Sequence, residues 1–143
     1  MVAQVLGARV FPGDRREVGW GGVSLTDEGG SDPVFGDSGP TLEAFHMHGD
    51  TYELPPDARH LARSDCYAQQ AFEWGGVVYG LQFHLEFTES MVQRLTGDAE
   101  IVRYLRESGA APEAILAEAP ERLARIEETA QRVFQNYFQQ CGL

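Results

Sequence analysis

The stretch Gly80-Leu81-Gln82-Phe83-His84-Leu85-Glu86 joins an apolar run to a histidine and, two residues later, a glutamate. Side chains at positions i and i+2 of an extended segment lie on the same face. Glu86 is therefore placed to orient the imidazole of His84 and to stabilise its charged form. A base with its orienting carboxylate is useful only beside a nucleophile, so the presence of a nucleophile decides what this chain can do.

Length and composition indicate one soluble domain. A chain of 143 residues with 43% hydrophobic residues and 10% aromatic residues can bury its own core. The net charge of -11 arises from 22 acidic residues against 11 basic residues, all of them arginine and none clustered into a stripe. Nucleic acid and anionic membranes are therefore not expected as partners. With no apolar run of about 20 residues and no signal peptide at its start, the chain is expected in the cytoplasm.

The pattern along the chain predicts short strands followed by helices. The start reads as the tail of a helix that Gly7 closes, and strands are expected at 9–11, 17–25, 44–48, 52–54, 59–63, 71–74 and 77–83. Residues 26–40 read as a surface loop, and Gly75-Gly76 as a hairpin turn. Thr88 and Asp98 are predicted N-caps of two helices, which end near Gly97 and Ser108-Gly109. A last helix is expected with Pro120 in its first turn and an apolar stripe packed on the sheet.

Several motifs in one order resemble the class I glutamine amidotransferases. Gly80–Glu86 is similar to the motif that supplies the histidine and glutamate of their Cys-His-Glu triad. The other similar segments are Val5–Val10, which resembles the residues just after the nucleophile elbow, Glu17–Trp20, Ala44–Pro55 and Gln69–Phe72. Ala44–Pro55 resembles the branch related to the amidotransferase domain of GMP synthase, and residues 98–138 resemble a helical extension of stand-alone members.

The resemblance implies an α/β fold, namely the C-terminal portion of a flavodoxin-like three-layer amidotransferase domain with a partly antiparallel hairpin section and a helical C-terminal tail. Residues 1–97 are expected to form the truncated domain, and residues 98–143 a helical extension packed on it. The resemblance assigns His84 and Glu86 to catalysis. It also assigns Gln69, Ala71 and Phe72 to backbone recognition of the substrate glutamine, with Gln69 standing where the family motif has asparagine.

The histidines of His46-Met47-His48-Gly49-Asp50 lie two residues apart, which on a strand places both rings on one face as in a metal site. No third ligand follows at a recognisable spacing, and the resemblance implies no metal or other cofactor. His48 and Asp50 are therefore expected to support the site structurally, with Asp50 and Thr51 continuing a turn.

The sequence departs from the family at the nucleophile. The family's cysteine lies in a Gly-x-Cys-x-Gly elbow, a strained strand-to-helix turn that also forms the oxyanion hole. No such motif occurs in the chain, and the resemblance places it just upstream of Met1. Cys66 has no flanking glycines and Cys141 lies near the C-terminus, so neither is expected to be a nucleophile, to form a disulfide or to bind zinc.

The expected function is that of a glutamine amidotransferase-like protein that has little or no glutaminase activity alone. The resemblance implies glutamine as ligand and an ammonia-accepting synthetase as partner. A non-catalytic interaction module and a hydrolase of γ-glutamyl compounds are the alternatives. Loss of the first strands of a doubly wound sheet would expose an edge and apolar helix faces, so self-association or a domain rearrangement is expected.

Overall fold

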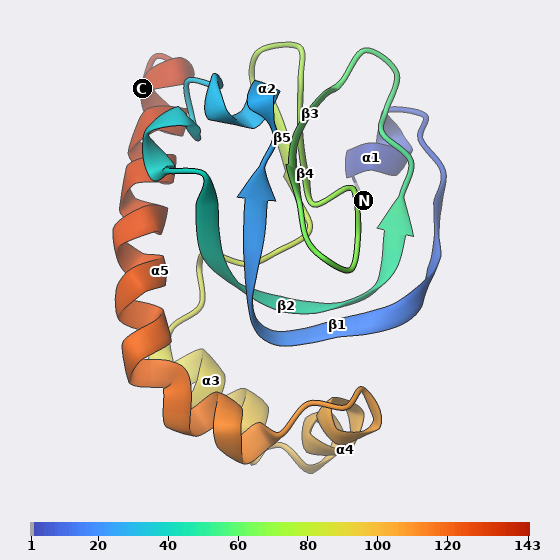
Figure 1. Ribbon diagram of the computed structural model, residues 1–143, viewed down its shortest axis with the longest axis vertical. Coiled ribbons are helices and arrows are strands. Elements are labelled where there is room, and N and C mark those ends of the chain that lie inside the picture. Colours follow the sequence, from blue (N-terminus) through green and yellow to red (C-terminus); the bar gives the residue numbers. More distant parts are fainter. Residues whose placement is uncertain (1) are drawn as a thin grey trace.

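The computed structural model describes residues 2–143, and its strands form a five-stranded sheet in the order β2-β1-β3-β4-β5. Every neighbouring pair in this sheet is antiparallel. The strands are β1 (Val10–Leu25), β2 (Thr41–Tyr52), β3 (Arg59–Arg63), β4 (Ala71–Trp74) and β5 (Val78–Leu81). Figure 1 shows β1 and β2 curling together around one side of the molecule.

The helices lie mostly in the C-terminal third of the chain. They are α1 (Val2–Val5), α2 (Asp27–Gly30), the 3-10 turn η1 (Gly36–Ser38), α3 (Glu89–Gly97), α4 (Ala99–Glu107) and α5 (Pro112–Gln140). In Figure 1, α5 runs along one side of the sheet, while α3 and α4 lie together at one end of it. Among the described helices, none has the length and apolar character needed to cross a bilayer.

The main core lies between the sheet and α5. Its strand residues include Val23, Ala44, Leu61 and Ala71, each fully buried. The helix contributes Ile126, Ala130 and Val133, which recur at helical spacing and form one face of α5. The expected α/β fold with a helical C-terminal tail is confirmed. The antiparallel hairpin section was expected to be only part of the sheet, but in residues 2–143 it contains every paired strand.

The predicted helix caps of the first two C-terminal helices are confirmed. The Thr88 hydroxyl accepts a hydrogen bond from the Met91 amide, and the Asp98 carboxylate accepts from the amides of Glu100 and Ile101. These side chains satisfy amides that a helix N-terminus otherwise leaves without a partner. Gly7 closes α1 with a φ of 88°, as expected of a C-cap glycine.

Four predicted boundaries are wrong. The last helix begins at Pro112, so Pro120 lies inside it rather than in its first turn.

β1 and β2 are each continuous, and Asp50 and Thr51 belong to β2 rather than to a turn. The strands stay continuous because β1 and β2 pair along nearly their whole lengths, with an irregularity between Pro12 and Glu17 that absorbs the change of register. The predicted surface loop 26–40 contains α2 and η1.

Candidate active site

His84 and Glu86 lie on the segment that follows β5. The His84 amide donates to the Phe45 carbonyl at 2.8 Å, and the Phe45 amide donates to the His84 carbonyl at 3.1 Å, which fixes this backbone against β2. Phe83 and Leu85 are each 3% exposed and point into the core. Because side chains alternate along extended backbone, His84 and Glu86 face the opposite way, toward solvent.

The two side chains form a close pair. His84 Nδ1 lies 2.6 Å from Glu86 Oε1, and the side chains are 37% and 52% exposed respectively. A carboxylate at this distance accepts the Nδ1 proton, which fixes the ring tautomer and leaves Nε2 as the nitrogen that exchanges protons. Phe87 anchors the following turn, since its ring stacks on Phe45 with centroids 4.2 Å apart.

A groove of about 440 Å³ runs beside this pair. It is lined by residues of α1, β2, β4, the segment 79–86 and α5, namely Val2, Ala3, Tyr52, Phe72, Tyr79, Gly80, Leu81, Gln82, Phe83, His84, Leu85, Glu86 and Phe134. Of the three residues predicted to bind glutamine, all of them described, the structure brings only Phe72 to this groove. Ala71 is fully buried in the core, and Gln69 is half-buried in the loop before β4.

Tyr52 and Gly80 are features of the groove that sequence reasoning missed. The Tyr52 hydroxyl is buried and has no hydrogen-bond partner among the described residues, and burial raises the pKa of Tyr52. A Cβ atom at Gly80 would lie 2.2 Å from the Phe72 ring, so only glycine allows this ring to sit against β5. Phe72 and Gly80 are direct partners across β4 and β5, which explains their contact. The sequence could have revealed this contact only if the register of the two strands had been known.

A second polar cluster lies between β1 and β2. His48 Nε2 is 3.0 Å from Glu17 Oε2, and His46 Nδ1 is 3.5 Å from the same oxygen. The Gln70 amide donates to this oxygen at 2.5 Å. His48 Nδ1 contacts the backbone carbonyl of Asp50 at 3.0 Å, so Asp50 meets His48 through its main chain.

The charges of this cluster follow from burial and proximity. Burial alone would raise the pKa of Glu17, but the hydrogen bond from His48 and the nearby His46 lower it to about 2. Burial lowers the pKa of His46 to about 4, against the attraction of Glu17. At neutral pH the cluster therefore holds an ionised carboxylate beside a neutral His46 imidazole.

The two cysteines lie in different surroundings. Cys66 is half-buried in the loop after β3, where burial and the Glu17 carboxylate raise the pKa of its thiol. A reactive cysteine needs the opposite shift, because the thiolate is the attacking species. Cys141 lies directly after α5.

Comparison with known proteins gives related sequences and structures. No family profile matches the chain. The glutamine amidotransferase-like protein YfeJ of Salmonella typhimurium is 32% identical over 113 residues, which are 74% of this chain and 47% of that protein. A GMP synthase (glutamine-hydrolysing) of Neisseria meningitidis is 31% identical over 91 residues, which are 62% of this chain and 18% of that enzyme.

Solved structures agree with the sequence relatives. A glutamine amidotransferase from Thermotoga maritima superposes with a TM-score of 0.84 at 28% identity, over 96% of this chain and 57% of that one. A glutamine amidotransferase from Methylobacillus flagellatus gives a TM-score of 0.79 at 26% identity, over 97% of this chain and 58% of that one. The chain thus spans about half the length of the relatives it matches most extensively. The chain is therefore related to part of a class I glutamine amidotransferase, over 74% of its length by sequence and over 96% of its length by structural superposition.

Proposed function

We propose that this chain carries the histidine and glutamate of a glutamine-hydrolysing site. The observation that supports this most directly is the 2.6 Å contact between His84 Nδ1 and Glu86 Oε1, at the edge of a groove large enough for an amino acid. The thiol that such a site requires is proposed to come from a part of the protein outside these 143 residues, because they contain no Gly-x-Cys-x-Gly elbow and burial raises the pKa of the Cys66 thiol.

In the completed site, a thiolate attacks the γ-carboxamide carbon of glutamine and forms a tetrahedral oxyanion. The C–N bond then breaks, and His84 Nε2 gives a proton to the departing nitrogen, which leaves as ammonia. Water attacks the resulting thioester while His84 takes up its proton, and glutamate is released. Glu86 holds the tautomer of His84 and stabilises its charged form throughout.

The groove supplies the contacts for the substrate in this proposal. Phe72 covers one wall, and the Tyr52 hydroxyl offers a hydrogen bond that no described residue uses. Backbone groups near Gln69 and Ala71, which do not line this groove, are proposed to hold the α-amino and carboxylate groups of glutamine from its edge. His48 and Asp50 are proposed to support this side of the site by fixing the end of β2. The released ammonia would pass to a synthetase.

A chimera tests the proposal in a working enzyme. The 91 matched residues of the Neisseria meningitidis GMP synthase are replaced by the matching part of this chain, and GMP synthesis is measured with glutamine or with free ammonia. Free ammonia bypasses the glutamine step, so it reports whether the remainder of the enzyme is still active, and circular dichroism of both chimeras checks that the replaced part has folded. We expect His84→Ala to lower the glutamine-dependent rate by about 100-fold or more, with the ammonia-dependent rate unchanged. Equal glutamine-dependent rates in the two chimeras would refute the proposed role of His84.

The isolated chain has its own expected result. Without a suitable thiol, it should release no more ammonia from glutamine than its His84→Ala variant does. Turnover well above that control would show that a nucleophile is present within the chain.

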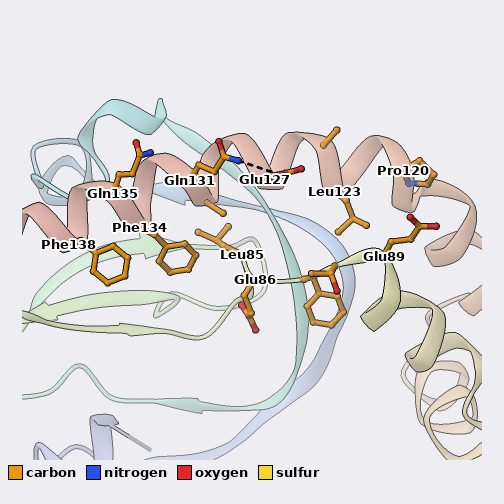
Figure 2. A pocket seen from close by; sticks show the side chains of 14 residues that line it. Leu85, Glu86, Glu89, Pro120, Leu123, Glu127, Gln131, Phe134, Gln135 and Phe138 are labelled. Carbon is orange, nitrogen blue, oxygen red and sulfur yellow. Dashed lines mark hydrogen bonds between the residues drawn. The ribbon is translucent and has the colours of Figure 1, made fainter. Parts of the chain in front are cut away.

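A non-catalytic interaction module is the second candidate, and one surface favours it. A groove of about 810 Å³ lies between α5 and residues 85–89 (Figure 2). Phe134 and Phe138 line it, although they are 41% and 50% exposed. Exposed aromatic residues in a groove are typical of protein contact sites. If this candidate were right, the chimera with this chain would fail with glutamine and work with ammonia, with or without His84.

A further inference from the structure

The cluster of Glu17, His46 and His48 has the composition of a metal site. One ligand-type atom from each residue lies within 4.8 Å of the other two. We propose that these three side chains bind one divalent transition-metal cation, with Zn²⁺ as the best chemical match. Two imidazoles and one carboxylate form a common zinc ligand set, in which a water takes the fourth tetrahedral position.

The hydrogen bonds of His48 support a cation between it and Glu17. Nδ1 lies 3.0 Å from the Asp50 carbonyl, which only accepts, so Nδ1 carries the proton. In a neutral imidazole, Nε2 then presents a lone pair, yet it lies 3.0 Å from the Glu17 carboxylate, which also only accepts. Two acceptors at this distance require a cation between them, either a proton or a metal. A histidine whose other nitrogen donates to a backbone carbonyl is also the usual arrangement at a metal.

His46 favours the metal over the proton. Its side chain is 2% exposed, and neither ring nitrogen has a hydrogen-bond partner among the described residues. Buried polar atoms normally have a partner, because a buried group without one loses the hydrogen bonds that water would give it. A proton shared by Glu17 and His48 would leave both ring nitrogens of His46 unsatisfied, whereas a metal would take Nδ1 as a ligand and leave Nε2 alone without a partner.

The geometry is compatible with zinc. Donor atoms about 2.0 to 2.1 Å from a tetrahedral zinc lie about 3.3 Å from one another. The Glu17 oxygen lies 3.0 Å from His48 Nε2 and 3.5 Å from His46 Nδ1. The Gln70 amide donates a hydrogen bond to this same Glu17 oxygen, and ligating carboxylates at metal sites also accept such outer hydrogen bonds.

An approach from solvent exists at His48. This residue lines an open groove of about 750 Å³ together with Asp14 and Asp50. Arg15 and Arg16 line the same groove, so its two carboxylates are balanced by two guanidinium groups. Of the three proposed ligands, His48 lines this groove, whereas Glu17 and His46 lie behind it.

The test uses the chain after dialysis against a chelator, followed by titration with Co²⁺ as a coloured substitute for zinc. We expect one equivalent to bind with the visible absorption of a tetrahedral site. X-ray absorption on the zinc-loaded protein should show two imidazole nitrogens per metal. This second measurement needs no variant, so it remains decisive if a substitution prevents folding.

The variants locate the site. Glu17→Gln keeps the shape of the side chain and removes its charge, and it should weaken binding by more than the roughly 10- to 100-fold typical of losing an outer hydrogen bond. His84→Ala is the matched control, because His84 and Glu86 are the other close histidine–carboxylate contact, and it should bind as the wild type does. Absence of binding, equal binding by Glu17→Gln, or loss of binding in His84→Ala would each overturn the proposal.

Discussion

At the residue scale, Gly29 shows how closely α2 approaches the sheet. A Cβ atom built there lies 2.0 Å from the Leu61 carbonyl oxygen, which also accepts a hydrogen bond from the Thr26 amide. Backbone in a paired strand cannot move aside as a side chain can. We therefore expect Gly29→Ala to lower the free energy of unfolding by about 1 to 3 kcal/mol or more, measured by urea denaturation.

The neighbouring Gly30 supplies the control for this experiment. It lies in the same helix and is exposed, and a Cβ atom added to it would meet no other atom within 4 Å. Gly30→Ala should leave stability unchanged or raise it by up to about 1 kcal/mol, since alanine favours helix. Similar losses in both variants would mean that helix geometry, rather than the contact with Leu61, sets the cost.

The two polar clusters differ in how far the sequence predicts them. His84 and Glu86 are two residues apart, so strand alternation alone places them on one face. Glu17 meets His48 only through the pairing of β1 with β2, in which these two residues are direct partners. The register between β1 and β2 depends on side-chain packing and on the irregularity after Pro12. Neither of these can be predicted from the spacing of residues in the sequence. The third ligand-type residue beside His46 and His48 was missed for this reason.

At the element scale, Trp20 joins β1 to α5. Its indole nitrogen donates to the Ile115 carbonyl at 3.0 Å, and its ring meets Phe45 edge-on at 4.8 Å. Trp20→Phe removes the hydrogen bond and part of the packing. We expect the free energy of unfolding to fall by about 1 to 3 kcal/mol, from the lost hydrogen bond and the space left behind, measured by thermal or urea unfolding.

Trp74 is the matched control, because its indole nitrogen also donates to a backbone carbonyl, that of Pro56 at 3.1 Å. Trp74 is 37% exposed and lies on β4, and its indole nitrogen contacts a loop rather than α5. Trp74→Phe should therefore cost less than Trp20→Phe. The reverse order would contradict the idea that Trp20 anchors the long helix.

The long helix shows where sequence patterns fail at this scale. Pro120 is typical of a first helical turn, yet α5 begins at Pro112 and continues through Pro120. Figure 1 shows α5 bending in its N-terminal part, as an internal proline requires. The Trp20 indole donates to a carbonyl just over one turn before this proline, so a tertiary contact supports the bend. The caps at Thr88 and Asp98 were predictable because each is a local hydrogen bond.

At the scale of the whole molecule, apolar side chains gather where β5 meets the C-terminal half of α5. β5 is an edge strand of the sheet, and Leu81 on it is 39% exposed. Phe134 lies beside Leu81 in a shared pocket, and Phe138 follows one helical turn later. Figure 2 shows Phe134 and Phe138 on the same face of α5. An edge strand flanked by exposed aromatic residues is a surface that pairs readily with another chain.

We therefore expect the isolated chain to self-associate through this surface, with a mass that rises with concentration in light scattering. Phe138→Glu should shift it toward monomer, because a charge there disfavours burial against a second copy. Leu116→Glu is the control: Leu116 is 46% exposed on α5, in its other half, and its replacement should leave the association unchanged. A wild-type chain that stays monomeric at all concentrations and melts in one sharp transition would show that this apolar surface is stable in water by itself.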